Sequence, residues 1–213
     1  MQNKLEQDNV TYINSDSKTA LSSFSHAFYG HFTELYDENR QVIMLCIGTD
    51  RVTGDSLGPI IGYKLNRYSA GIFKEIKVYG TLESPVHAKN LKETIDEIYS
   101  TYENPLVIAI DASLGNMNYV GYLTLGEGTI KPGSGVNKDL PEVGDIFITG
   151  IVNINGIMGS VSIQHTRLGL IMKMADIIYY GLVNSMGKVS YSKRQAEKLK
   201  ESEPETSVVD SLN

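Results

Sequence analysis

The sequence predicts a single α/β domain built around a largely parallel β-sheet, and three observations support this. Two continuous apolar runs, residues 42–47 and 106–110, have the pattern of strands that are buried on both faces of a sheet. Helix-like and strand-like segments alternate between them, which is typical of right-handed crossovers that join parallel strands. The chain has 213 residues, 41% hydrophobic and 21% charged, so one domain of this size can bury a full core.

The N-terminal part is expected to contribute one helix. Residues 1–16 are polar and mixed in charge, and we expect them to be disordered or frayed. Between residues 17 and 36, apolar side chains recur at steps of three and four, which predicts a helix with one face on the core. These side chains are Leu21, Phe24, Phe28, Phe32 and Leu35.

The central part is expected to supply the parallel strands and their crossover helices. The apolar strand at residues 42–47 is closed by Gly48. A helix is expected at 58–68 with Pro59 in its first turn, where the missing N–H of proline costs little. A second strand is expected at 76–79, a helix at 86–99, and a third strand at 106–110, followed by Asp111.

The C-terminal part is expected to add two strands, 119–129 and 145–153, joined by a Gly/Pro loop at 131–144. A nearly all-apolar helix is expected at 166–185, buried in the sandwich or at a subunit interface, so a homo-oligomer is possible. Residues 193–213 begin as a charged helix and lack the apolar side chains needed to fold. We therefore expect one domain over residues 17–192 and a largely disordered tail.

Composition and charge argue against several classes of partner, binding site and cellular location. The net charge of −6 is dispersed, and a nucleic-acid partner would need clustered Lys and Arg. The single cysteine, Cys46, excludes an internal disulfide and a cysteine-based zinc site. Residues 1–10 do not resemble a secretory signal, and no apolar run reaches membrane-spanning length. We expect a cytoplasmic protein without a membrane partner.

We expect the functional site where loops leave the carboxyl ends of the strands, because ligands of open parallel sheets bind at that edge. The loops at 48–59, 80–87 and 111–115 qualify, and the first and third carry Asp55 and Asp111. Each acid has a simpler interpretation, since Asp55 could cap the next helix and Asp111 could hold backbone amides in a turn. Two converging carboxylates would instead have separated pKa values, or would offer oxygen ligands to a divalent metal ion.

Other residues are candidates for supporting roles at the same edge. His165 and His87 could orient the acids or complete a metal site with Asp55 and Asp111, although each could be structural. The first loop could donate backbone amides through Gly48 and Gly54, but it lacks a phosphate-binding motif, and its acids, Asp50 among them, would repel phosphate. The loop at 131–144 could form an anion nest, a lid or a simple hairpin connection.

Several segments together resemble the YyaC-type sporulation proteins, which are classed as spore proteases. The similarity spans residues 41–178, and the motifs occur in one order. The matching segments are 46–51 (CIGTDR), 53–59 (TGDSLGP), 78–81 (VYGT), 84–88 (SPVHA), 110–112 (IDA), 132–141 (PGSGVNKDLP) and 143–145 (VGD).

That group is similar to the spore germination protease and the hydrogenase-maturation endopeptidases. The resemblance implies a phosphorylase/hydrolase-like three-layer α/β/α sandwich with a mostly parallel mixed sheet. It implies a catalytic role for Asp55, in a loop ending DSLGP, and for Asp111, in IDA. His165 stands where the maturation endopeptidases bind nickel, but Asp55 replaces their glutamate with a shorter acid.

We therefore expect a sporulation-associated peptidase that acts through Asp55 and Asp111 without a required cofactor. Its partner would be a protein or peptide substrate, such as the small acid-soluble spore proteins, in the sporulating cell or spore interior. One alternative is a metal-dependent endopeptidase that uses Asp55, Asp111 and His165. The other is a catalytically silent sporulation binding protein on the same scaffold.

Overall fold

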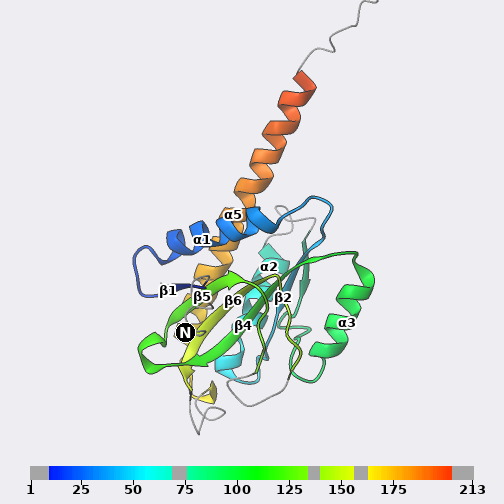
Figure 1. Cartoon of the computed structure of the whole chain (residues 1–213). Coiled ribbons are helices and arrows are strands. Elements are labelled where there is room, and N and C mark those ends of the chain that lie inside the picture. Colours follow the sequence, from blue (N-terminus) through cyan, green and yellow to red (C-terminus); the bar gives the residue numbers. More distant parts are fainter. Residues whose placement is uncertain (1–9, 69–75, 134–139, 156–162, 203–213) are drawn as a thin grey trace, which may run out of the picture.

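The computed structural model describes residues 10–68, 76–133, 140–155 and 163–202. Its elements surround one six-stranded mixed sheet with the strand order β1-β5-β6-β4-β2-β3 (Figure 1). In chain order they are β1 (Val10–Asn14), α1 (Ala20–Leu35), β2 (Val42–Cys46), η2 (Thr53–Asp55), α2 (Leu57–Tyr68), β3 (Ile76–Tyr79), α3 (Leu91–Thr101), β4 (Leu106–Gly115), η3 (Met117–Tyr119), β5 (Tyr122–Glu127), β6 (Ile146–Ile154) and α5 (Leu168–Ser202).

The sheet is parallel at its centre and antiparallel at one side. Strands β3, β2, β4 and β6 run parallel to one another, and β5 and β1 add antiparallel pairs beyond β6. All five side chains of β2 are buried, as the apolar run predicts for a strand between two parallel neighbours. The expected α/β sandwich with a mostly parallel mixed sheet is confirmed.

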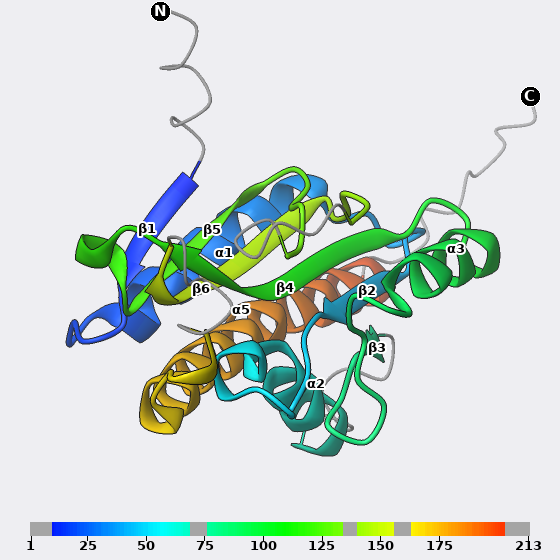
Figure 2. The same ribbon diagram turned by 90° about the horizontal axis from the view of Figure 1, so that it is seen from below.

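Helices cover the two faces of the sheet unequally. The larger core lies on the face covered by α1, α2 and α5, where Phe24, Phe28 and Phe32 of α1 are stacked in sequence and buried. The smaller core lies under α3, whose Leu91 and Ile98 pack against β2 and β4. Figure 2 shows α2 and α5 on one side of β2 and β4 and α3 on the other. The four-residue spacing of the phenylalanines explains why α1 packs with one stripe inward.

Several boundaries differ from the sequence prediction. The helix expected at 86–99 begins only at Leu91, because Val86 forms a parallel bridge with Ile47 instead. Residues 10–14, expected to be frayed, form strand β1 and pair with β5; residues 1–9 lie outside the described part. The third central strand does not end at residue 110 but continues to Gly115, because β6 pairs with it along this extension. The last helix does not end near residue 185 but continues to Ser202, through the expected start of the tail, while residues 203–213 lie outside the described part.

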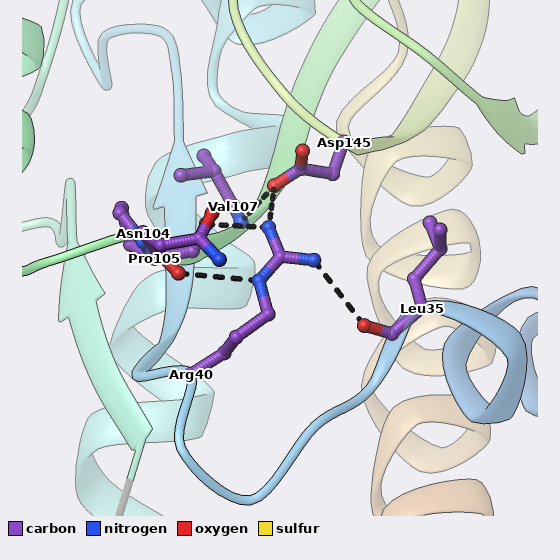
Figure 3. A network of polar contacts seen from close by, with 6 residues as sticks. All are labelled: Leu35, Arg40, Asn104, Pro105, Val107 and Asp145. Carbon is purple, nitrogen blue, oxygen red and sulfur yellow. Dashed lines mark hydrogen bonds and ion pairs between the residues drawn. The ribbon is translucent and has the colours of Figure 1, made fainter.

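A polar network joins the strands at the amino edge of the sheet (Figure 3). The Arg40 guanidinium donates to three backbone carbonyls, those of Leu35, Asn104 and Pro105, at 2.8–3.2 Å, and to Asp145 Oδ2 at 3.1 Å. The same carboxylate oxygen accepts from the buried N–H of Val107 at 2.8 Å. The network therefore ties the end of α1 to the starts of β4 and β6, opposite the edge where the strands end.

No helix in the described ranges is both long enough and apolar enough to cross a membrane.

Candidate active site

The end of β2 places the first loop directly beside Asp111. Cys46 on β2 is in register with Ile110 on β4, and the Ile47 N–H donates to the Ile110 carbonyl at 2.7 Å. Asp111 is therefore not a residue that follows a strand, as the sequence suggested, but one within β4. It lies level with the carboxyl end of β2, so the predicted edge of the sheet is still where the acid is found.

Asp111 is buried, with 6% of its surface exposed, and its carboxylate accepts the N–H of Ala112 at 2.8 Å and the N–H of Gly133. Burial raises its pKa well above the ordinary value, and the negative charge of Asp55 raises the pKa further. The two backbone N–H donors act in the opposite direction and lower the pKa in part. The structure thus brings Asp55 and Asp111 into electrostatic contact, and Asp111 retains its proton to higher pH than an ordinary aspartate.

The backbone of the first loop fixes the position of Asp55. The Thr49 N–H donates to the Asp55 carbonyl at 2.9 Å, and Gly48 has a φ of 138°, which L side chains rarely adopt. A Cβ on Gly48 would lie 2.0 Å from the Asp55 carbonyl oxygen, so only glycine permits this close approach. The Ser56 carbonyl accepts the N–H of Ile60, which gives Ser56 rather than Asp55 the N-cap position of α2. Asp55 is half-buried.

Gly54 joins the first loop to the segment before α5. A Cβ there would lie 2.3 Å from the Ile163 carbonyl oxygen and 2.8 Å from Thr166 Oγ1, so the two segments touch at this glycine. His165 belongs to this segment, but it lies in a turn and its side chain is exposed. Among the described residues, no three His, Cys, Asp or Glu side chains are placed to hold a metal ion. The set Asp55, Asp111 and His165 therefore does not fit a metal site in this conformation.

The remaining sequence candidates lie in different surroundings. Asp50 is exposed in a turn of the first loop. His87 is half-buried, and its backbone N–H donates to Asn90 Oδ1 at 2.8 Å. The buried ring nitrogen Nδ1 of His87 has no hydrogen-bond partner within the described residues. Cys46 is fully buried, and burial raises the pKa of its thiol, so it behaves as a small hydrophobic residue of the core.

The loop between β5 and β6 contributes to the site through its backbone. Ile130 and Val143 form an antiparallel bridge, as expected for a hairpin connection, and Gly133 donates to Asp111. Residues 134–139, which include part of the expected anion nest, lie outside the described part. The sequence pointed to this loop by its glycines but could not show that a backbone amide reaches Asp111.

Thr149 is a neighbour of Asp111 that the sequence did not reveal. It is in register with Asp111 across the β4–β6 ladder, and its Oγ1 lies 2.6 Å from Thr124 Oγ1 and 3.4 Å from Ser113 Oγ. A threonine within a strand is an ordinary β-sheet residue, so only the register shows its proximity to the acid.

Fold and site together define an α/β sandwich protein with two interacting aspartates at the carboxyl edge of its parallel strands. The chain belongs to the family DUF1256, described as a protein of unknown function, whose model matches residues 12–181. It is 51% identical over 143 residues to the uncharacterized protein YyaC of Bacillus subtilis (strain 168), covering 67% of this chain and 68% of the relative. The family match contains the whole site.

Proposed function

We propose that this protein is a peptidase that hydrolyses peptide bonds with Asp55 and Asp111. The observation that carries the proposal is the buried Asp111 carboxyl, whose pKa is raised by burial and by the charge of Asp55. Two carboxyl groups with separated pKa values can provide an acid and a base in one site, as paired-carboxyl hydrolases require.

The difference between the two environments assigns the roles. Asp55, half-buried on the first loop, is the ionised group and removes a proton from the attacking water. Asp111, buried and protonated, donates a hydrogen bond to the carbonyl oxygen and then a proton to the leaving amine. Backbone amides of the first loop are candidates to stabilise the developing oxyanion. Activity should therefore fall as the pH rises through the pKa of Asp111.

The substrate class follows from the resemblance to the spore germination protease. Small acid-soluble spore proteins are the first substrates to test, and the sporulating cell or spore interior is the expected compartment. The same family membership is compatible with a catalytically silent binding protein, because a fold does not determine turnover.

The test is cleavage of small acid-soluble spore proteins by the purified wild-type protein and by Asp55→Asn and Asp111→Asn. Each substitution should lower the rate by at least ~10²-fold, the scale of general acid–base catalysis. Asp50→Asn is the matched control, because Asp50 lies on the same loop but is exposed, and it should retain activity. Circular dichroism of each variant establishes that it is folded.

Two outcomes would replace the proposal. Full cleavage by a folded Asp55→Asn or Asp111→Asn protein would exclude the aspartate pair. Cleavage that is abolished by a chelator and restored by a divalent metal, with dependence on His165, would favour the metal-dependent alternative. If the wild-type protein binds spore proteins stably without cleaving them, the binding-protein alternative is the one to pursue.

A further inference from the structure

The connection between β5 and β6 returns to the sheet beside the acid on β4. Its two arms are held together at Ile130 and Val143, whose backbones exchange two hydrogen bonds of 3.0 Å. From this bridge the chain reaches the acid, because the Gly133 N–H donates to the carboxylate of Asp111. We call residues 130–133 the covering arm.

The covering arm and Asp111 belong to one packed layer, on the face of the sheet that bears α3. Side chains two residues apart on a strand point to the same face, so Asp111 shares the face of Ala109, which is buried in the smaller core. Ile130 of the arm packs against the same core, and Pro132 of the arm is buried. Asp111 itself is only 6% exposed. With the arm in place, its carboxyl is too enclosed for a substrate peptide to lie against it.

The Gly133 contact conflicts with the role proposed for Asp111. In the proposed reaction the protonated carboxyl donates a hydrogen bond to a substrate carbonyl oxygen, at an O···O distance of about 2.5–3.0 Å. Here a peptide group of the chain itself lies at that carboxyl, and it presents an N–H rather than a carbonyl. An N–H donor stabilises the ionised carboxylate, which cannot donate. The arm therefore occupies the acid and favours the protonation state that the reaction does not use.

We propose that the structure shows an autoinhibited conformation, in which the Gly133 amide of the covering arm blocks Asp111 and must withdraw before a substrate peptide can reach the acid. The inhibitory meaning of the contact rests on the proposed function, whereas the movement of the arm does not. The movement is local, because it breaks the hydrogen bond at the acid and withdraws Ile130 and Pro132 from their packing while the strands stay paired.

Protonation of Asp111 favours both release of the arm and the proposed chemistry. An ionised carboxylate accepts a stronger hydrogen bond than a neutral carboxyl, so the proton weakens the hold on Gly133. The neighbours of Asp111 on the adjacent strands, Ile47 and Thr149, are uncharged. The charged or titratable residues on the segments around the acid are Asp50, Arg51, Asp55, His87 and Lys131. Of these, Asp55 acts on Asp111, and its negative charge favours the protonated acid and thus release of the arm.

The first test measures whether the carboxyl of Asp111 becomes reactive when the arm is loosened. The full-length protein is treated at mildly acidic pH with a water-soluble carbodiimide and glycine ethyl ester, and labelling of each carboxyl group is followed by peptide mass spectrometry. The exposed Asp50 is the internal reference. The wild type is compared with Ile130→Ala and Ile95→Ala. Ile95 is the matched control, because it is also a half-buried isoleucine packed against the smaller core, but it lies on α3.

In the wild type, Asp111 should react far more slowly than Asp50. Ile130→Ala should speed the labelling of Asp111 roughly 5- to 30-fold, the scale on which truncation of a packed side chain shifts an equilibrium. Ile95→Ala should change the rate much less, because it loosens the same core without loosening the arm. Equal acceleration in the two variants, no acceleration in Ile130→Ala, or a wild-type Asp111 as reactive as Asp50 would overturn the proposal.

Amide hydrogen exchange tests the movement in the wild type, so it also decides the matter if Ile130→Ala does not fold. The Gly133 amide should exchange faster than the amide of Ala109, which lies in the middle of β4 and is released only when the sheet opens. Its protection factor should fall as the pH is lowered through the pKa of Asp111. Equal protection of the two amides would mean that the arm opens only with the whole domain, and it would refute the proposal. Protection of Gly133 that does not change with pH would refute the role of the proton.

The two proposals can fail separately. Cleavage of small acid-soluble spore proteins that is faster with Ile130→Ala than with the wild type or Ile95→Ala would support both. An arm that opens in the labelling and exchange experiments, without cleavage by any of these proteins, would support the movement and count against the peptidase. Cleavage that is slower with Ile130→Ala, although Asp111 is labelled faster, would mean that the Gly133 amide assists the reaction, and autoinhibition would be wrong.

Discussion

Replacing Asp145 with alanine should destabilise the protein without touching the candidate site. Asp145 belongs to one of the motifs on which the sequence resemblance rests, yet the structure places it at the amino edge of the sheet, in the network around Arg40. One oxygen of its carboxylate accepts from two donors, Arg40 Nη2 at 3.1 Å and the Val107 N–H at 2.8 Å. Alanine removes both acceptor contacts at once.

The size of the effect follows from the burial of the two donors. Val107 is fully buried, and an orphaned buried N–H costs ~1–3 kcal/mol. The ion pair between Arg40 and Asp145 contributes less, ~0.5–1 kcal/mol, because the Asp145 side chain is 35% exposed and water screens it. Asp145→Ala should therefore lower the free energy of unfolding by about 1.5–4 kcal/mol, which corresponds to roughly 3–16 °C in Tm.

Asparagine at the same position separates the two contributions. Its amide oxygen can still accept from the Val107 N–H, while the charge opposite Arg40 is lost, so Asp145→Asn should cost only ~0.5–1 kcal/mol. Urea unfolding followed by circular dichroism at pH 7 measures both variants. If Asp145→Asn is as destabilising as Asp145→Ala, or if Asp145→Ala costs less than about 1 kcal/mol, the orphaned N–H is not the main cause of the lost stability.

Three further predictions concern the candidate site. Because the folded-state pKa of Asp111 is raised, its stabilising contribution is full below about pH 4 and is lost as the pH rises through the folded pKa. Asp111→Asn should therefore raise Tm relative to wild type more at pH 7 than at pH 4. An equal difference in Tm at both pH values contradicts this. Asp55→Asn should lower the pKa of Asp111 seen by carboxyl ¹³C NMR but leave it above the ordinary value, since burial is the larger cause; an unchanged titration would mean that the two acids do not interact. Gly54→Ala should lower Tm and the proposed peptidase activity, because its Cβ would meet the Ile163 carbonyl oxygen. Gly187→Ala, where a Cβ meets nothing within 4 Å, should leave the proposed activity unchanged and raise stability by up to ~1 kcal/mol.

The centre of the fold could be predicted from the sequence because its signals are local. The apolar run of β2, the proline at the start of α2 and the phenylalanine stripe of α1 each encode one element within a few residues. The convergence of Asp55 and Asp111 also followed, because parallel strands end at one edge and both acids are at or beyond that edge. Their catalytic role stays a prediction.

Other features depend on partners that are distant in sequence. Strand β1 has only five residues, and it becomes a strand only because β5 offers a free antiparallel edge. The continuation of β4 beyond Asp111 depends on pairing with β6, since its last residues include Ser113 and Gly115. The Gly133 amide and the Thr149 hydroxyl reach the neighbourhood of Asp111 only through the β5–β6 connection and the strand register. No local pattern marks any of these contacts.

The strand order also has a consequence for how the protein is made. The N-terminal strand β1 pairs with β5, so Val10 leaves the ribosome long before its partner Gly126 is synthesised. At 5–20 residues per second, the delay is roughly 6–23 s. Throughout that time the buried face of α1, with Phe24, Phe28 and Phe32, has neither β5 nor α5 to cover it. The nascent chain should therefore be a client for ribosome-associated chaperones, and its yield in a cell-free system should rise when they are supplied.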